Sequence, residues 1–324
     1  MIFKFSRLLA FAIMALLFVA SCKTPKATSS APEKAPTETN WVQKLQDTPP
    51  VPAVRDNPNS LLWEISGNDL EVPSYLYGTI HLIGEADFIM TDLIKDRFSR
   101  TAQLTLEIDM DDPVGLLMAA TGVFMNDGET LSSLLGEEDY ERLSNYFRDT
   151  LDMDISFFNK MKPLLVSTMM TESTIEGPVT SYETVFMEMA GKADMEILGL
   201  ETAAFQMSMF DSIPYAQQAE MLMEGLDGSG DMGQDLFETM VDLYKKQDLD
   251  GLYALITEES EDLGNFESLL LDKRNTNWIP VIERMSKEKP TFFAVGAAHL
   301  PGELGVIQLL KDAGFELTPL REIP

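Results

Sequence analysis

One eight-residue motif, G-x-x-H-L-x-G-E, occurs twice in this chain and constrains its fold more than any other feature. The first copy spans residues 78–85 and the second spans residues 296–303, and each follows an apolar, strand-like run. The chain has 2 His among its 324 residues, and they are His81 and His299, one in each copy. The glycine that opens each copy allows a tight turn just after the strand. The repeat therefore predicts an α/β (α+β) fold, with a pseudo-symmetric sheet built from two strand–GxxH–helix halves.

The periodicity of apolar residues places further elements around the two copies. We expect strands at 61–65, 75–77, 103–108, 195–198, 291–295 and 315–319. We expect helices at 87–100, 137–150, 156–172, 181–190, 215–226, 234–246, 265–271, 278–287 and 304–313. The stretch from about 113 to 265 is mostly helical, so we interpret it as a large insertion between the two halves.

The start of the chain has the character of a bacterial lipoprotein signal. A basic beginning and an apolar run at 8–20, too short for a comfortable membrane span, precede Val-Ala-Ser-Cys ending at Cys22. We predict a signal peptide at 1–21, a lipid on the Cys22 thiol and a flexible Pro- and Thr-rich tether at 22–55. The folded domain then covers 56–324 and is anchored to a membrane of the cell envelope, facing the periplasm. The alternative is a plain secretory signal with a chance cysteine.

The charge and the cysteine count exclude several classes of function. The formal net charge is −29 and the isoelectric point is about 4.2, which argues against nucleic acid as a partner because such binding needs a basic face. The same charge argues against direct binding of anionic lipid by the protein surface. Cys22 is the single cysteine, so the domain has neither a cysteine nucleophile nor an internal disulfide.

Polar residues stand at the carboxyl ends of four predicted strands, namely His81, Glu107, Glu201 and His299. Ligand sites in open α/β sheets lie beyond these ends, so the four side chains converge if the strands are parallel neighbours. Two histidines with one or two carboxylates suit zinc, manganese, iron or cobalt. Such a metal would acidify water and polarise a carbonyl, and a remaining glutamate could act as a general base. The alternative is that both histidines are core residues satisfied by hydrogen bonds.

Three motifs of other protein classes do not occur. The sequence contains no H-E-x-x-H, no G-x-S-x-G and no P-loop. A Ser–His–acid triad stays open on composition, although no serine lies in a supporting motif. Arg274 could hold a substrate carboxylate or steady an oxyanion.

Five motifs occur in a fixed order: Leu76-Tyr77-Gly78-Thr79-Ile80-His81-Leu82, Leu106-Glu107-Ile108-Asp109, Gly199-Leu200-Glu201-Thr202, Arg274-Asn275 with Trp278, and Val295-Gly296-Ala297-Ala298-His299-Leu300-Pro301-Gly302. As an ordered set they resemble the TraB/GumN family, which includes the Tiki metalloproteases, over roughly residues 61–319. The resemblance implies a fold related to the erythromycin-esterase and ChaN-like proteins, with the two G-x-x-H loops facing each other. It also implies metal-dependent peptide cleavage. The residues that it marks are His81, His299, Glu107 or Glu201, and Arg274.

These observations predict a lipid-anchored periplasmic metal-dependent hydrolase, in particular a peptidase that acts on a peptide or protein substrate. We expect a divalent metal (manganese, cobalt or zinc) to be held by His81, Glu107 and His299. We expect Glu201 to act as base or further ligand, and Arg274 with Asn275 to orient the substrate. One alternative is a non-catalytic lipoprotein that binds a peptide or haem in the same cleft. Another is an esterase that uses histidine as a base without metal.

Overall fold

The computed structural model describes residues 49–322 except 174, 176, 229–230 and 261–267, together with residue 45. The predicted signal peptide and Cys22 lie outside the described residues. Contacts with the folded body begin within the last residues of the predicted tether, where Arg97 Nη2 donates to the Val51 carbonyl oxygen and Val54 pairs with Arg321. No helix in the described ranges is long and apolar enough to span a bilayer.

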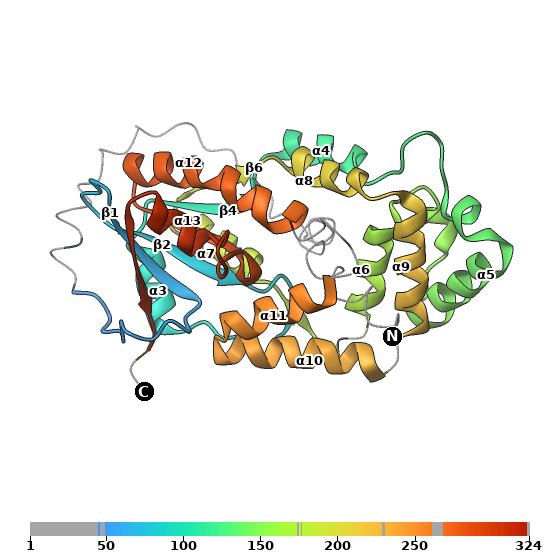
Figure 1. The fold of residues 1–324 in the computed structure, drawn as a ribbon, viewed down its shortest axis with the longest axis horizontal. Helices are drawn as coiled ribbons and strands as arrows, with labels where there is room; N and C mark the ends of the chain where they lie inside the picture. The colour runs from blue at the N-terminus through green and yellow to red at the C-terminus, as the bar shows by residue number, and fades with distance from the viewer. Residues whose placement is uncertain are drawn as a thin grey trace.

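A six-stranded, mostly parallel sheet with the strand order β6-β4-β7-β2-β1-β8 forms one end of the molecule (Figure 1). Its strands are β1 (Leu62–Gly67), β2 (Ser74–Thr79), β4 (Gln103–Ile108), β6 (Glu196–Glu201), β7 (Thr291–Gly296) and β8 (Phe315–Leu320). The neighbours β6, β4, β7 and β2 are parallel, whereas β1 runs antiparallel to β2 and to β8. The predicted α/β fold class is confirmed.

The two strands that precede the repeated motif lie side by side. In the parallel pair β2–β7, Gly78 lies opposite Val295 and Thr79 lies opposite Gly296. All six residues of each strand are buried. Parallel strands covered on both faces have continuous rather than alternating apolar sequences, which explains why β7 reads Thr-Phe-Phe-Ala-Val-Gly. The repeat in the sequence is therefore a pair of adjacent strands in the sheet.

Helices surround the sheet and build the other end of the molecule. They are α3 (Asp92–Ser99), α4 (Pro113–Thr121), α5 (Leu131–Leu151), α6 (Pro163–Glu172), α7 (Tyr182–Lys192), α8 (Ala203–Met209), α9 (Tyr215–Asp227), α10 (Asp231–Lys246), α11 (Leu249–Ser260), α12 (Lys273–Glu288) and α13 (Val306–Asp312). Figure 1 shows α5, α6 and α9 packed together far from the sheet, with α4 and α8 along the upper edge and α10 and α11 along the lower edge. A short two-stranded sheet pairs β3 (Ile83–Gly84) with β5 (Val179–Thr180).

Several predicted helix boundaries differ from the observed ones for local reasons. The helix expected at 87–100 begins at Asp92, because the Thr91 hydroxyl accepts the Ile94 N–H and caps it there. The helix expected at 156–172 is divided, because Pro163 starts a new helix and removes a backbone donor. Helices α4, α8 and α11 were not expected at all. Each is short or lacks a clean amphipathic stripe, and packing rather than periodicity sets its limits.

The stretch before α12 also differs from the expectation. Of the helix expected at 265–271, residues 265–267 are outside the described residues. Ser268–Asp272 forms one π-helical turn, η6, that runs directly into α12. The charged run at 272–275, expected as a loop, therefore lies in a continuous helical segment. Leu271 and Arg274 are both buried, so this segment turns one face toward the interior although its sequence is polar.

Candidate active site

The carboxyl edge of the parallel strands gathers the candidate residues. Glu107 is the second-last residue of β4, and Glu201 is the last residue of β6. His81 lies two residues after the end of β2. His299 ends the short 3-10 turn η7 (Ala297–His299), which follows β7. Because these four strands are parallel neighbours, their ends lie at one edge of the sheet. The convergence expected from the sequence follows from this topology.

Glu107 is the centre of the site. Its Oε1 atom accepts the Gly296 N–H at 2.8 Å and lies 3.8 Å from His81 Nε2 and 3.7 Å from His299 Nε2. Its Oε2 atom accepts from Arg274 Nη2 at 2.5 Å and from Gln206 Nε2 at 3.1 Å. Burial is the largest single influence and opposes the charged form, but Arg274, the two histidines and the Gly296 N–H together outweigh it and hold the pKa of Glu107 well below its usual range. The carboxylate is therefore ionised.

His81 is held through its other ring nitrogen. Nδ1 lies 2.9 Å from Glu183 Oε1, and the same oxygen accepts the Thr79 hydroxyl at 2.7 Å. Nδ1 donates to this carboxylate oxygen, and Nε2 is directed toward Glu107. Burial lowers the pKa of His81, but the Glu183 carboxylate more than compensates and the pKa rises to about 9.

His299 is held in the same manner by a neutral partner. Nδ1 donates to Asn275 Oδ1 at 2.6 Å, and Nε2 accepts from Arg274 Nη1 at 3.1 Å. The ring packs against the indole of Trp278, with 4.4 Å between the ring centroids. Burial and the neighbouring Arg274 charge lower the pKa of His299 to about 3. His299 is therefore a neutral imidazole at physiological pH, which is the form that binds metals.

Arg274 and Glu201 form a layer behind these three side chains. Arg274 Nε donates to Glu201 Oε1 at 2.9 Å, and Nη1 also donates to the Leu270 carbonyl at 3.1 Å. The second oxygen of Glu201 accepts from the indole N–H of Trp278 at 3.0 Å. Burial raises the pKa of Glu201 despite the arginine beside it. Both carboxylate oxygens are engaged, and the arginine is only 3% exposed.

Glycine at position 296 keeps the space between the donors open. A Cβ atom there would lie 3.2 Å from Glu107 Oε1, 3.3 Å from His81 Nε2 and 3.5 Å from His299 Cδ2. The opening glycine of the first copy serves packing instead, because a Cβ on Gly78 would stand 3.1 Å from the Ala297 Cα of the second copy. The two motif glycines thus have different tasks.

The donor set fits a divalent metal. Donors around one ion at metal–ligand distances of about 2.1 Å lie about 3–3.5 Å apart, close to the 3.7 and 3.8 Å that separate Glu107 Oε1 from the two Nε2 atoms. Each histidine is anchored through Nδ1, as metal-bound histidines are. In the described residues no three His, Cys, Asp or Glu side chains stand as an assembled metal centre.

All six residues predicted for the site lie together, while three of their partners were not predicted. His81, Glu107 and His299 form the centre, and Glu201, Arg274 and Asn275 surround them; their roles stay predictions. Glu183 contacts His81 and Gln206 contacts Glu107, and the Thr79 hydroxyl donates to Glu183. Thr79 belongs to the first motif, but Glu183 and Gln206 come from α7 and α8, which no motif marks. Only the packing of those helices against the sheet could reveal them.

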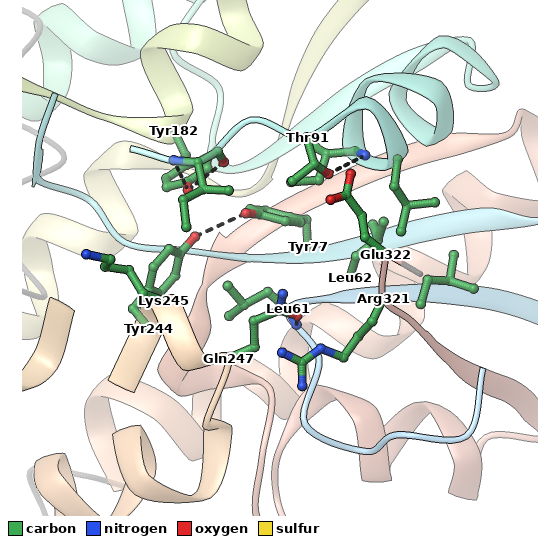
Figure 2. Close-up of a pocket in the computed structure, with 14 residues that line it drawn as sticks. Leu61, Leu62, Tyr77, Thr91, Tyr182, Tyr244, Lys245, Gln247, Arg321 and Glu322 are labelled. Carbon is green, nitrogen blue, oxygen red and sulfur yellow. Dashed lines mark hydrogen bonds between the residues drawn. The ribbon is translucent and has the colours of Figure 1, made fainter. Parts of the chain in front are cut away.

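A pocket beside the first motif is lined by three tyrosines, Tyr77, Tyr182 and Tyr244 (Figure 2). Tyr244 Oη donates to the Gly78 carbonyl at 2.9 Å and lies 3.3 Å from Tyr77 Oη. Tyr182 Oη donates to the Ile89 carbonyl at 2.8 Å. The bonds of Tyr244 hold the backbone just before His81, and the bond of Tyr182 holds the first turn of α7 against the segment at Ile89.

Fold and site define a class: an α/β protein whose parallel strands bring two histidines, a glutamate and an arginine to one edge. The chain belongs to the TraB/PrgY/gumN family, which residues 61–319 match.

Curated relatives are distant. Metalloprotease TIKI2 of Danio rerio is 24% identical, with 84% of this chain and 63% of the relative covered. Metalloprotease TIKI2 of Xenopus tropicalis is 23% identical (82% and 61% covered), and metalloprotease TIKI1 of Homo sapiens is 23% identical (80% and 61% covered). The chain thus spans less than two thirds of the length of these relatives. No solved structure matches the chain significantly.

Proposed function

We propose that this protein is a metal-dependent peptidase whose metal is held by His81, Glu107 and His299. One observation carries the proposal: the Nε2 atoms of both histidines stand 3.7–3.8 Å from the same carboxylate oxygen, Glu107 Oε1. Both Nδ1 atoms are occupied elsewhere, so the two Nε2 atoms are the donors directed at the centre. Kinship with metalloproteases of the TIKI type supports a divalent metal and a peptide or protein substrate.

The protein's own residues would prepare the site in three ways. Arg274 helps to keep Glu107 ionised, and burial together with the Arg274 charge keeps His299 unprotonated, so both are ready to bind a cation. Asn275 and Glu183 fix the ring orientations. A bound metal would supply Lewis-acid polarisation of a peptide carbonyl and would make water more acidic. In this proposal Arg274 and Glu201 position the donors, because their polar atoms are already engaged with one another and with Glu107.

The proposal also covers the location of the protein in the cell. The apolar run at 8–20 and the lipobox-like end at Cys22 support lipidation and a place in the bacterial envelope, facing the periplasm. Metabolic labelling with a fatty-acid analogue tests this part separately. Label on the wild-type chain that is lost in Cys22→Ala is the expected result, and an unlabelled wild-type chain would refute it.

Elemental analysis of the full chain in detergent tests the metal site directly. We expect about one divalent metal per chain after incubation with manganese, cobalt or zinc. We expect its loss in the His81→Ala/His299→Ala variant together with loss of peptide cleavage. A matched control is Lys192→Ala. Lys192 is an exposed residue in the last turn of α7 and is far in sequence from the proposed metal ligands. Absence of metal from the wild-type chain would refute the proposal. It would favour the alternatives of a non-catalytic binding protein or an esterase that works without metal.

A further inference from the structure

We infer that Glu183 is a positioning residue that makes the two histidines unequal, with His81 the stronger metal ligand and His299 the weaker. The inference rests on the proposed function, because it concerns the affinity of the same site for a divalent metal. It adds a residue from the helical insertion, Glu183 of α7, to the machinery of a site whose other parts come from the strand ends and α12.

Glu183 is a buried carboxylate with a specific task. It is 6% exposed, and its Oε1 atom accepts from both His81 Nδ1 and the Thr79 hydroxyl. Its Oε2 atom is buried and has no hydrogen-bond partner among the described residues. Burying a carboxylate with one oxygen unsatisfied costs free energy, so packing alone does not explain this residue. The hydrogen bond from His81 Nδ1, which holds the imidazole in one orientation, does explain why a carboxylate is buried here.

The carboxylate stands on a rigid support. Ser181 caps α7 by accepting the Thr184 N–H, which places Glu183 in the first turn. The neighbouring Tyr182 is fully buried, and its ring centroid lies 5.4 Å from that of Tyr77 in the strand that leads to His81 (Figure 2). Because Tyr182 also bonds to the Ile89 carbonyl, this turn of α7 is fixed relative to the first motif. Glu183 is therefore positioned before any metal binds.

The corresponding partner of His299 is weaker. Asn275 offers a neutral amide oxygen, and Arg274 Nη1 donates to the Nε2 lone pair that a metal would need. After it loses its Nε2 proton, an imidazole whose Nδ1–H donates to a carboxylate is a stronger ligand than one whose Nδ1–H donates to a neutral acceptor. The two copies of the motif are thus alike in sequence but differ in ligand strength, because their partners come from different helices.

Metal titration of the full chain in detergent, stripped with EDTA and titrated with Co²⁺ and Zn²⁺ against a chelator, tests the inference. We expect Glu183→Gln, which keeps the shape and removes the charge, to weaken binding 10- to 100-fold. We expect His81→Gln to weaken binding at least tenfold more than His299→Gln. The control Glu188→Gln removes an exposed carboxylate from the same helix, and we expect its affinity to stay within threefold of wild type.

The outcomes separate this inference from the proposed function. Two results would overturn the inference while leaving the metal site standing, provided that the wild-type chain binds metal. One is a Glu183→Gln affinity equal to that of the wild type, and the other is an equal loss of affinity in the two histidine variants. Equal affinity losses in Glu183→Gln and Glu188→Gln would show an effect of net charge and not of position, and would also overturn it. A wild-type chain that binds neither ion would overturn both. The histidine ranking decides the matter even if Glu183→Gln does not fold.

Discussion

At the scale of single residues, Gly296 gives the sharpest test of the donor cluster. Its φ of −51° is open to any residue, so alanine would not strain the backbone there. The added Cβ would instead occupy the space between Glu107 Oε1 and His81 Nε2. We expect Gly296→Ala to weaken metal binding tenfold or more while the chain still folds, as measured by metal titration and circular dichroism.

Gly191 provides the matched control for that substitution. A Cβ at Gly191 meets nothing within 4 Å, and the residue is the second-last of α7. Gly191→Ala should leave metal affinity unchanged and raise the free energy of unfolding by at most about 0.5 kcal/mol, because the helix end gains less than its middle. If both alanine variants bind metal like the wild type, the space beside Gly296 is not where the ion sits.

At the scale of elements, α8 connects the site to the helical end of the molecule. Gln206 of α8 donates to Glu107, and the Met207 carbonyl of the same helix accepts from Lys162 Nζ at 3.0 Å. Lys162 is fully buried and also pairs with Asp211 at 2.8 Å. It lies just before α6, so this one side chain ties two helices together.

Removing the Lys162 ammonium should therefore destabilise the molecule. Lys162→Met leaves the Met207 carbonyl without its charged donor, and we expect the free energy of unfolding to fall by about 1–3 kcal/mol in urea denaturation. Lys192→Met is the control, because Lys192 forms only an exposed i,i+4 pair with Glu188 and should change stability by less than about 0.5 kcal/mol. Equal stability of the two variants would contradict the assigned role of Lys162.

At the scale of the whole molecule, stability should depend on pH through the two histidines. An unfolded histidine titrates near pH 6.5, whereas folded His81 has a pKa of about 9 and folded His299 a pKa of about 3. The raised pKa of His81 contributes stability that is complete below pH 6.5 and lost as the pH rises to 9. The lowered pKa of His299 contributes stability that is complete above pH 6.5 and lost as the pH falls toward 3.

The metal-free protein should accordingly be most stable near pH 6.5. Urea denaturation of the EDTA-treated chain between pH 5 and 9.5 measures this curve. We expect His81→Gln to remove the alkaline decline and His299→Gln to reduce the acid decline above pH 5, where few carboxylates titrate. The chain has 2 His, so no other histidine can mask the effect. A wild-type curve that stays level from pH 6.5 to 9 would refute the assignment for His81.

The sequence by itself determined the strands, the repeat and the three residues at the centre of the proposed site. Strand β4 was expected at 103–108 and is found there, and the strand expected at 291–295 became β7. The second is a nearly continuous apolar run, as expected for a strand buried on both faces, whereas the first alternates polar and apolar residues with the period of a strand. His81, Glu107 and His299 could be proposed because each stands at the end of such a strand.

Only the tertiary structure decided what surrounds those donors. Glu183 and Gln206 lie on helices whose sequences mark one face as buried but not which neighbour that face meets. The polar run containing Arg274 reads as a loop, yet it is helical because its guanidinium pairs with Glu107 and Glu201, residues far away in the chain. Hydrogen bonds and ion pairs between distant segments depend on how the elements pack, and local periodicity carries no record of that packing. The unequal environments of two histidines in identical motifs have the same origin.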